Sequence, residues 1–167
     1  MLTDDISVPR GKFYEPVVAW VRHHPWKTTA ITLGLVLFEQ VATLPFGEVS
    51  ALASRKPGTT ALMEERAAEL RGDGKKLRMI QQWVPLKAIS PDLVNAVIVA
   101  EDGTFWSHHG FDWFELKESV QRDIEEGRAA RGASTITQQL VKNLFLSTSK
   151  NPLRKMKEWV LTWWMEQ

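Results

Sequence analysis

The stretch GASTITQQLVKN at residues 132–143 decides how the second half of this 167-residue chain folds. A glycine leads into a run of hydroxyl residues, and apolar residues then keep the four-residue spacing of one helix face, at Ile136, Leu140 and Leu144. Unpaired backbone N–H groups and the positive end of the helix dipole make such a start an anion site. Lys142 follows Gln138 by four residues, a spacing that turns its charge toward the same side. Ordinary N-capping by Ser134 is the alternative interpretation, and it accounts for one hydroxyl only.

Helix signals also flank this stretch. Ser90, Pro91 and Asp92 combine a capping hydroxyl, a proline for the first helical position and an acid for the first turn. Further helices are expected from near Trp113 to Glu126, and from Asn151 to the end of the chain. No alternation of strands and helices is apparent. The sequence therefore predicts a mainly α fold.

An acid closes the first of these helices. Leu93 and Val97 precede Glu101 on one helix face, so the carboxyl group is expected at the end of an apolar stripe. Partial desolvation and the negative end of the helix dipole both raise the pKa of such a carboxyl, which suits a general acid or base. The alternative interpretation is that Glu101 opens a solvated turn with Asp102.

The twelve residues 101–112 concentrate acids, histidines, aromatic residues and two glycines. A pair such as His108 and Asp112 is too small a set of ligands to predict a metal site. We expect His108 to orient the loop that presents Glu101.

A third cluster lies near the end of the chain. Arg154 and Glu158 are four residues apart on the last expected helix, and Lys155 is three residues from the same acid. A surface ladder of ion pairs is one interpretation. The other is a pair of cations that binds phosphate beside a second carboxylate. The tryptophans that follow suit either a membrane interface or a protein core.

The composition excludes several classes of protein. Lys and Arg total 21 against 20 Asp and Glu, and this balance argues against a nucleic-acid partner. The absence of cysteine rules out disulfides, a thiol nucleophile and cysteine-ligated metals. Eight tryptophans are a high number for this length, and tryptophan favours membrane interfaces and ligand platforms.

An apolar stretch near the N-terminus predicts a membrane anchor. Residues 28–47 carry one charge, Glu39, and as a helix they would span about 30 Å. Arg22 and Lys27 precede them, as expected of a cytoplasmic boundary. A buried core helix and a cleaved signal peptide are the alternatives. The expected organisation is a cytoplasmic tail (1–27), a transmembrane anchor (28–47), a connector (48–75) and a catalytic part (76–167).

Together the three clusters resemble the peptidoglycan glycosyltransferase family (family 51), the lysozyme-like transglycosylases that polymerise lipid II. The motif E-D-x-x-F-x-x-H-x-G-x-D is matched by Glu101, Asp102, Phe105, His108, Gly110 and Asp112. The motif G-x-S-T-I-T-Q-Q-x-x-K-N is matched by Gly132, Ser134, Thr135, Ile136, Thr137, Gln138, Gln139, Lys142 and Asn143. The motif R-K-x-x-E is matched by Arg154, Lys155 and Glu158.

The resemblance implies an inverting glycosyl transfer and assigns the catalytic roles. Glu101 would deprotonate the acceptor sugar 4-hydroxyl, and Glu158 would be a second essential acid that positions the donor or a divalent cation, Mg²⁺ or Mn²⁺. Lys142, Arg154 and Lys155 would hold the diphosphate leaving group together with the helix start. The remaining substrate-binding residues that it implies are Asp102, Phe105, His108, Ser134, Thr135, Thr137, Gln138, Gln139 and Asn143.

The resemblance also implies where the protein acts and with what. The partners would be lipid II, the growing undecaprenyl-linked glycan, the membrane, and proteins of cell-wall synthesis or division. A single anchor without a transpeptidase domain is typical of the monofunctional members, at the bacterial inner membrane with the catalytic part in the periplasm.

Family members continue through two further motifs, whereas nine residues follow Glu158 here. The expectation is thus an incomplete, C-terminally truncated domain. The alternative function is a non-catalytic, membrane-anchored remnant or interaction module that binds a lipid diphosphate.

Overall fold

The computed structural model describes residues 14–76, 78–127 and 132–167. Residues 1–13 of the predicted tail, and Leu77 and residues 128–131 of the predicted catalytic part, lie outside this description. The described residues contain helices, turns and extended links but no strand, which confirms the mainly α prediction. The chain divides into two compact units, Met1–Thr43 and Leu44–Gln167.

The first unit contains two helices, α1 (Glu15–His23) and α2 (Pro25–Ala42). Proline begins α2 at a position where its missing N–H costs no hydrogen bond. The helical stretch Pro25–Ala51 is long and apolar enough to cross a membrane, with a mean hydropathy of 1.5 and 6% of its most apolar window buried. That exposure argues against the buried core helix. A signal sequence would pass the same test, so the anchor stays a prediction.

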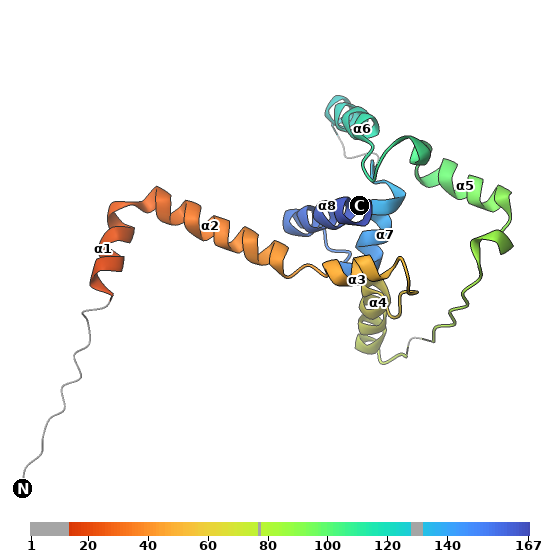
Figure 1. Cartoon of the computed structure of the whole chain (residues 1–167), viewed down its shortest axis with the longest axis horizontal. Helices are drawn as coiled ribbons and strands as arrows, with labels where there is room; N and C mark the ends of the chain where they lie inside the picture. The colour runs from red at the N-terminus through yellow and green to blue at the C-terminus, as the bar shows by residue number, and fades with distance from the viewer. Residues whose placement is uncertain (1–13, 77, 128–131) are drawn as a thin grey trace, which may run out of the picture. The chain divides into compact units, whose positions relative to one another are not determined.

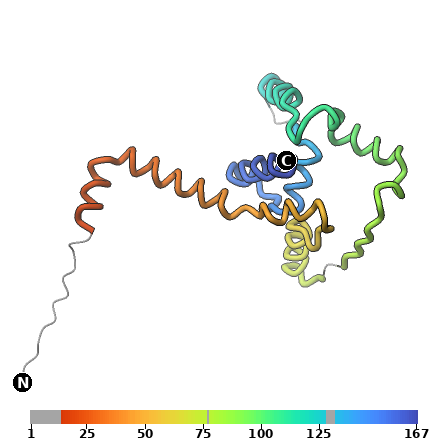
Figure 2. The backbone as a smooth tube through the Cα atoms, viewed as in Figure 1, coloured from red at the N-terminus to blue at the C-terminus, as the bar shows by residue number. Residues whose placement is uncertain are grey.

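Four helices form the packed part of the second unit: α3 (Phe46–Ala51), α4 (Ala61–Gly72), α7 (Ile136–Phe145) and α8 (Pro152–Met165). In Figure 1 and Figure 2 they gather together, with α7 packed against α8 and α4, and α3 packed against α8. Val141 of α7 and Leu161 of α8 are fully buried at this junction. The core is therefore small and centred on the helix that residues 132–143 predicted.

The segment predicted as a connector contributes to this packing. The rings of Phe46 and Trp164 lie 5.1 Å apart, and the indole N–H of Trp164 donates to Ser50 Oγ at 3.0 Å. On α4, the carboxylate of Glu65 accepts hydrogen bonds from the backbone N–H and the hydroxyl of Thr148, the N–H at 2.9 Å. Helices α3 and α4 thus brace the two site-bearing helices, and the boundary at residue 76 stays a prediction.

Two further helices, α5 (Pro91–Glu101) and α6 (Trp113–Glu126), complete the second unit. Short 3₁₀ helices, Leu86–Ala88 and Phe105–Ser107, precede each of them. The expected cap is present on α5, where Ser90 Oγ accepts from the Asp92 N–H at 3.2 Å. The apolar face of α5, however, is exposed, with Leu93 at 58% and Val97 at 48%. The desolvated stripe that the sequence predicted is absent around this helix.

Candidate functional site

The start of α7 is held by reciprocal caps. Thr135 Oγ1 accepts from the Gln138 N–H at 3.2 Å, and the Gln138 side chain accepts from the Thr135 N–H at 3.0 Å. The Thr135 hydroxyl also donates to the carbonyl of Gly110 at 2.7 Å. The cap is thus Thr135 and not Ser134, since Thr135 and Gln138 are the buried pair. The hydroxyl of Ser134 is left to serve another partner.

Asp102 ties the first motif to the same helix start. One of its buried carboxylate oxygens accepts from the Ile136 N–H at 2.9 Å, and the other pairs with His108 Nε2 at 2.9 Å. The ring of Phe105 meets the His108 ring edge to face, with centroids 6.3 Å apart. These contacts fit the expectation that His108 orients the loop that presents Glu101. They give Asp102, His108 and Phe105 a positioning role around α7.

Asp112 caps the start of α6. Its carboxylate accepts from the Glu115 N–H at 2.8 Å and from the hydroxyl of Thr104. The Thr104 hydrogen bond is the main cause that lowers the pKa of Asp112, against the opposing effect of burial. The loop between α5 and α6 is therefore closed by a bond between its two ends.

Asp102, His108 and Asp112 offer three metal-ligating atoms within 4.8 Å of one another. Each of the four carboxylate oxygens already accepts a hydrogen bond or pairs with the imidazole. A cation at this point would have to displace the bonds that cap α6 and α7. The arrangement fits a structural network better than a metal site.

Glu101 lies at the C-terminal end of α5 and meets the first turn of α7. Its carboxylate accepts from Gln139 Nε2 at 3.0 Å, and the same amide lies 3.4 Å from the carbonyl of Ser134. Glu101 is exposed, so the predicted partial desolvation is wrong for the part of the chain that the structure describes. The cause is the uncovered face of α5, which leaves water around the carboxylate. The Gln139 contact brings this acid to the start of α7, the stretch predicted as an anion site.

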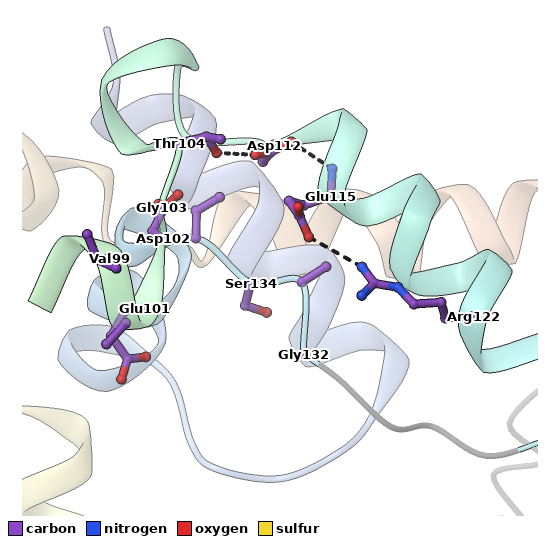
Figure 3. A pocket seen from close by; sticks show the side chains of 13 residues that line it. Val99, Glu101, Asp102, Gly103, Thr104, Asp112, Glu115, Arg122, Gly132 and Ser134 are labelled. Carbon is purple, nitrogen blue, oxygen red and sulfur yellow. Dashed lines mark hydrogen bonds and ion pairs between the residues drawn. The ribbon is translucent and has the colours of Figure 1, made fainter. Parts of the chain in front are cut away.

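A cavity of about 280 Å³ lies beside this acid. Figure 3 shows the side chains that line it. Glu101 lines it from the end of α5 and Asp102 from the residue that follows. Ser134 lines it from the segment just before α7, and Glu115 and Arg122 line it from α6. Because it is bounded by three helices and includes an exposed carboxylate, it is the candidate substrate pocket.

The cations of the third motif converge on a buried carboxylate. Arg154 Nη1 contacts one oxygen of Glu158 at 2.5 Å, and the ammonium of Lys155 contacts the other. Glu158 is 2% exposed, so the interpretation as a surface ladder is wrong. Lys155 also donates to Ser134 Oγ at 3.2 Å, across from α8 to the start of α7. The cluster keeps a net charge of +1 next to the helix start.

A continuous set of contacts therefore joins the two predicted acids. It runs from Glu101 through Gln139 and Ser134 to Lys155, and from there to Glu158. The sequence predicted all five residues as site residues. The structure adds that the contacts from Glu101 and those from Glu158 meet at Ser134.

Three predicted residues stand apart from these contacts. The hydroxyl of Thr137 donates to Glu166 at 2.7 Å and so fastens α7 to the end of α8. Lys142 and Asn143 lie farther along α7, and their side chains form no hydrogen bond or ion pair within the described parts of the chain. Thr137 is thus structural here, whereas Lys142 keeps its ammonium available to a ligand.

The divalent cation implied by the resemblance does not fit Glu158 in this arrangement. Both oxygens of that carboxylate are engaged by cationic side chains, which neutralise the charge that a metal requires. Within the described residues, Glu158 thus has no oxygen left free for a metal ion.

Sequence reasoning missed the contributions of Thr104, Glu115 and Arg122. A hydroxyl eight residues before an aspartate carries no periodic signal, and the bond between Thr104 and Asp112 depends on the turn between them. Glu115 and Arg122 are two turns apart on α6, which the sequence presents as an ordinary solvated face. Their place in the cavity wall follows only from the direction of α6.

Known proteins resemble this chain over most of its length. The family model described as Transglycosylase matches residues 72–167. A protein of Chromobacterium violaceum named biosynthetic peptidoglycan transglycosylase is 38% identical over 120 residues, which are 72% of this chain and 53% of that protein.

Relatives of the same name show similar partial coverage. The one from Methylobacillus flagellatus is 37% identical over 142 residues, 85% of this chain and 61% of the relative. The one from Aromatoleum aromaticum is 45% identical over 106 residues, 64% and 46% respectively. The chain spans about half the length of the curated relatives that it matches.

Proposed function

The chain belongs to the transglycosylase family, and from that membership we propose that it polymerises the glycan strands of peptidoglycan from lipid II. The donor is a growing glycan on undecaprenyl diphosphate, and the acceptor is lipid II. The observation that carries the proposal is the set of contacts from Glu101 to Lys155, which joins an exposed carboxylate to a cationic cluster across one helix start.

The first half of the reaction uses the exposed carboxylate. Glu101 takes the proton of the acceptor 4-hydroxyl as the oxygen attacks the anomeric carbon of the donor from the face opposite the diphosphate. The configuration inverts, and no covalent sugar–enzyme intermediate forms. The hydrogen bond from Gln139 fixes the carboxylate without occupying its second oxygen, which remains able to accept the proton.

The second half uses the cations. The bond between the anomeric carbon and the diphosphate oxygen breaks, and the departing diphosphate takes the electron pair and gains one negative charge. Lys142 and Lys155 are the ammonium groups that stabilise that charge, aided by the start of α7. Lys155 is 38% exposed, while Arg154 is 14% exposed and holds Glu158. Glu158 therefore acts as a buried counter-charge that sets the position of both cations.

The proposed location is the bacterial inner membrane, with α2 as a single anchor and the second unit in the periplasm. The candidate membrane-spanning helix supports the anchor. Because the chain has no cysteine, single cysteines report topology without background. We expect Ser54→Cys to react with an impermeant maleimide added outside the inner membrane, and Ser7→Cys to react only after lysis. Labelling of Ser7→Cys in intact cells would refute this orientation.

Polymerisation is tested with the purified full chain, lipid II and gel separation of the glycan products. We expect the chain to form polymer and Glu101→Gln to lower the rate by about 10²- to 10⁴-fold, the range that a general base contributes. Glu69→Gln is the matched control, since Glu69 is an exposed acid on α4 that pairs with Arg66. A chain that binds lipid II but forms no polymer would favour the alternative, a lipid-diphosphate-binding module.

A further inference from the structure

The cavity beside Glu101 contains a cation that the proposed reaction leaves without a role. Arg122 lines it from α6, and in Figure 3 Arg122 and Glu101 stand on opposite sides, with Ser134 and Gly132 between them. Glu115, two turns earlier on α6, is the only acid that pairs with Arg122 in the described parts of the chain. On the side of the pocket opposite Glu101, α6 thus contributes one arginine that is loosely paired with Glu115.

The guanidinium is only partly satisfied. Its Nε–H donates to the carbonyl of Glu118 at 3.2 Å, which fixes the plane of the group. Nη2 lies 3.6 Å from Glu115, a distance beyond that of a normal hydrogen bond. The four Nη hydrogens form no hydrogen bond within residues 14–76, 78–127 and 132–167. A guanidinium fixed by its Nε–H, with one long ion pair to Glu115, presents its two Nη groups as a fork for a planar anion.

We propose that Arg122 binds a carboxylate on the substrate, and that this carboxylate belongs to the peptide carried by the sugars of the lipid-linked acceptor. The assignment rests on the proposed function, since Glu101 must meet a sugar hydroxyl in this same cavity. At about 280 Å³ the cavity holds a sugar and a nearby substituent, near the lower limit of roughly 300 Å³ for small-molecule sites. A group attached to the bound sugar is therefore what reaches the opposite wall.

Charge distinguishes a carboxylate from the diphosphate of the same substrate. Four acids line the cavity, and two of them, Asp102 and Asp112, are already engaged in capping α7 and α6, which leaves Glu101 and Glu115. Arg122 is the one cationic side chain among the lining residues that the structure describes. A dianionic diphosphate would meet more negative than positive charge here, whereas Lys155 lies outside this cavity, beside the start of α7. A single carboxylate matches one arginine, and a bidentate pair of this kind is among the strong hydrogen-bonded contacts.

Because Glu115 pairs with Arg122, substitutions at these two residues should change carboxylate recognition in opposite directions. Glu115 competes with the incoming carboxylate for the same guanidinium. Removing the arginine should weaken recognition of the carboxylate, while neutralising Glu115 should strengthen it. A purely structural Arg122–Glu115 pair would make both substitutions act in the same direction.

The test compares lipid II with its peptide carboxylates intact and lipid II with those carboxylates amidated. Binding to the full chain in detergent is followed by tryptophan fluorescence, which requires no turnover. We expect the wild-type chain to bind the intact form about tenfold more tightly, the equivalent of one charge-assisted hydrogen bond. Arg122→Gln should abolish this preference and leave affinity for the amidated form unchanged, and Arg122→Lys should retain part of it.

Two further variants complete the design. Glu115→Gln should increase the preference a few-fold, and Arg66→Gln, which removes an exposed arginine in an ion pair on α4, should leave it unchanged. Equal binding of the two substrate forms by the wild-type chain would overturn the inference, as would an equal loss on both forms in Arg122→Gln. Polymer formation without discrimination rejects the Arg122 site alone, and discrimination without polymer rejects the proposed polymerisation alone.

Discussion

Glu101 and Glu158 are the two acids of the candidate site, and the structure treats them in opposite ways. Glu158 is buried on α8, and both of its oxygens are engaged by cations. Glu101 is exposed at the end of α5 and holds one hydrogen bond from Gln139. The helices α7 and α8 are thus held by hydrogen bonds between them and by ion pairs within α8, while α5 presents its acid at an exposed helix end. The comparison teaches that residues of the matched motifs divide into those that hold the helices together and those that the fold leaves exposed.

The sharpest test of this comparison is Glu158→Ala. The substitution leaves Arg154 and Lys155 next to each other without their shared counter-charge, in a place where Arg154 is 14% exposed. We expect the free energy of unfolding to fall by about 3 kcal/mol, near the lower end for a broken buried ion pair, because Lys155 can turn toward water. Denaturant unfolding followed by tryptophan fluorescence measures it. Glu69→Gln, in an exposed ion pair, should change the free energy of unfolding by less than about 1 kcal/mol. An equal loss in the two variants would show that Glu158 stabilises the fold no more than an exposed acid does.

How much of this division the sequence predicts depends on the kind of contact. The spacing of Arg154, Lys155 and Glu158 predicts that they meet, because residues three and four apart share a helix face. It does not predict that Glu158 is buried, because burial arises from α7 and α3 packing on α8. The spacing along the helix therefore predicts which side chains meet, whereas tertiary packing decides whether they are buried.

The next test asks how closely the loop of the first motif packs on α8. Gly110 has φ +75, and a Cβ there would lie 2.8 Å from Glu166 Cγ and 2.9 Å from Thr162 Cγ2. We expect Gly110→Ala to lower the free energy of unfolding by about 2 kcal/mol, from the left-handed backbone and from the clash with fully buried Thr162.

Gly127 provides the control for the backbone contribution. It has φ +62 at the end of α6, and a Cβ there would meet no atom within 4 Å. Gly127→Ala should therefore cost about 1 kcal/mol, the conformational part alone. Identical losses at the two glycines would show that the loop does not pack against α8 as described.

The loop contact is also the clearest case of a feature hidden from the sequence. Gly110 occurs in the matched motif, but nothing in its neighbours indicates that its carbonyl accepts from Thr135, 25 residues later. The same holds for Asp102, whose bond to the Ile136 N–H joins residues 34 apart. Such contacts depend on the path of the chain between the motifs, which short-range patterns do not encode.

A smaller effect, with a pH dependence, is expected in the loop between α5 and α6. The Thr104 hydroxyl lowers the pKa of Asp112, and a carboxyl with a lowered folded-state pKa stabilises the fold above its unfolded pKa. Thr104→Val should raise the pKa of Asp112 toward its ordinary value and cost about 1 kcal/mol at neutral pH. The cost should begin to fade below about pH 4, where Asp112 is protonated in the unfolded chain, and should be gone once the pH falls below the lowered pKa of the wild-type fold.

Unfolding measured from pH 7 to pH 2.5 for both proteins tests this dependence. Thr59→Val is the control, since Thr59 is exposed and its side chain has no hydrogen bond within the described residues. A stability difference that stays constant across this pH range would mean that the Thr104 contact acts on the fold without acting on the Asp112 carboxyl.

The smallest expected change in stability belongs to the residue with the largest expected effect on catalysis. Glu101→Gln keeps an amide oxygen that can accept from Gln139, and the exposed side chain has no charged partner within the described residues, so unfolding should shift by less than about 0.5 kcal/mol. The same substitution removes the proton acceptor of the proposed reaction. A loss above about 1 kcal/mol would place Glu101 among the residues that hold the helices together, beside Glu158. An unchanged free energy of unfolding together with abolished polymerisation would instead identify Glu101, at the end of α5, as the base. Only a residue that does not hold the helices together can lose its charge at no cost to the fold.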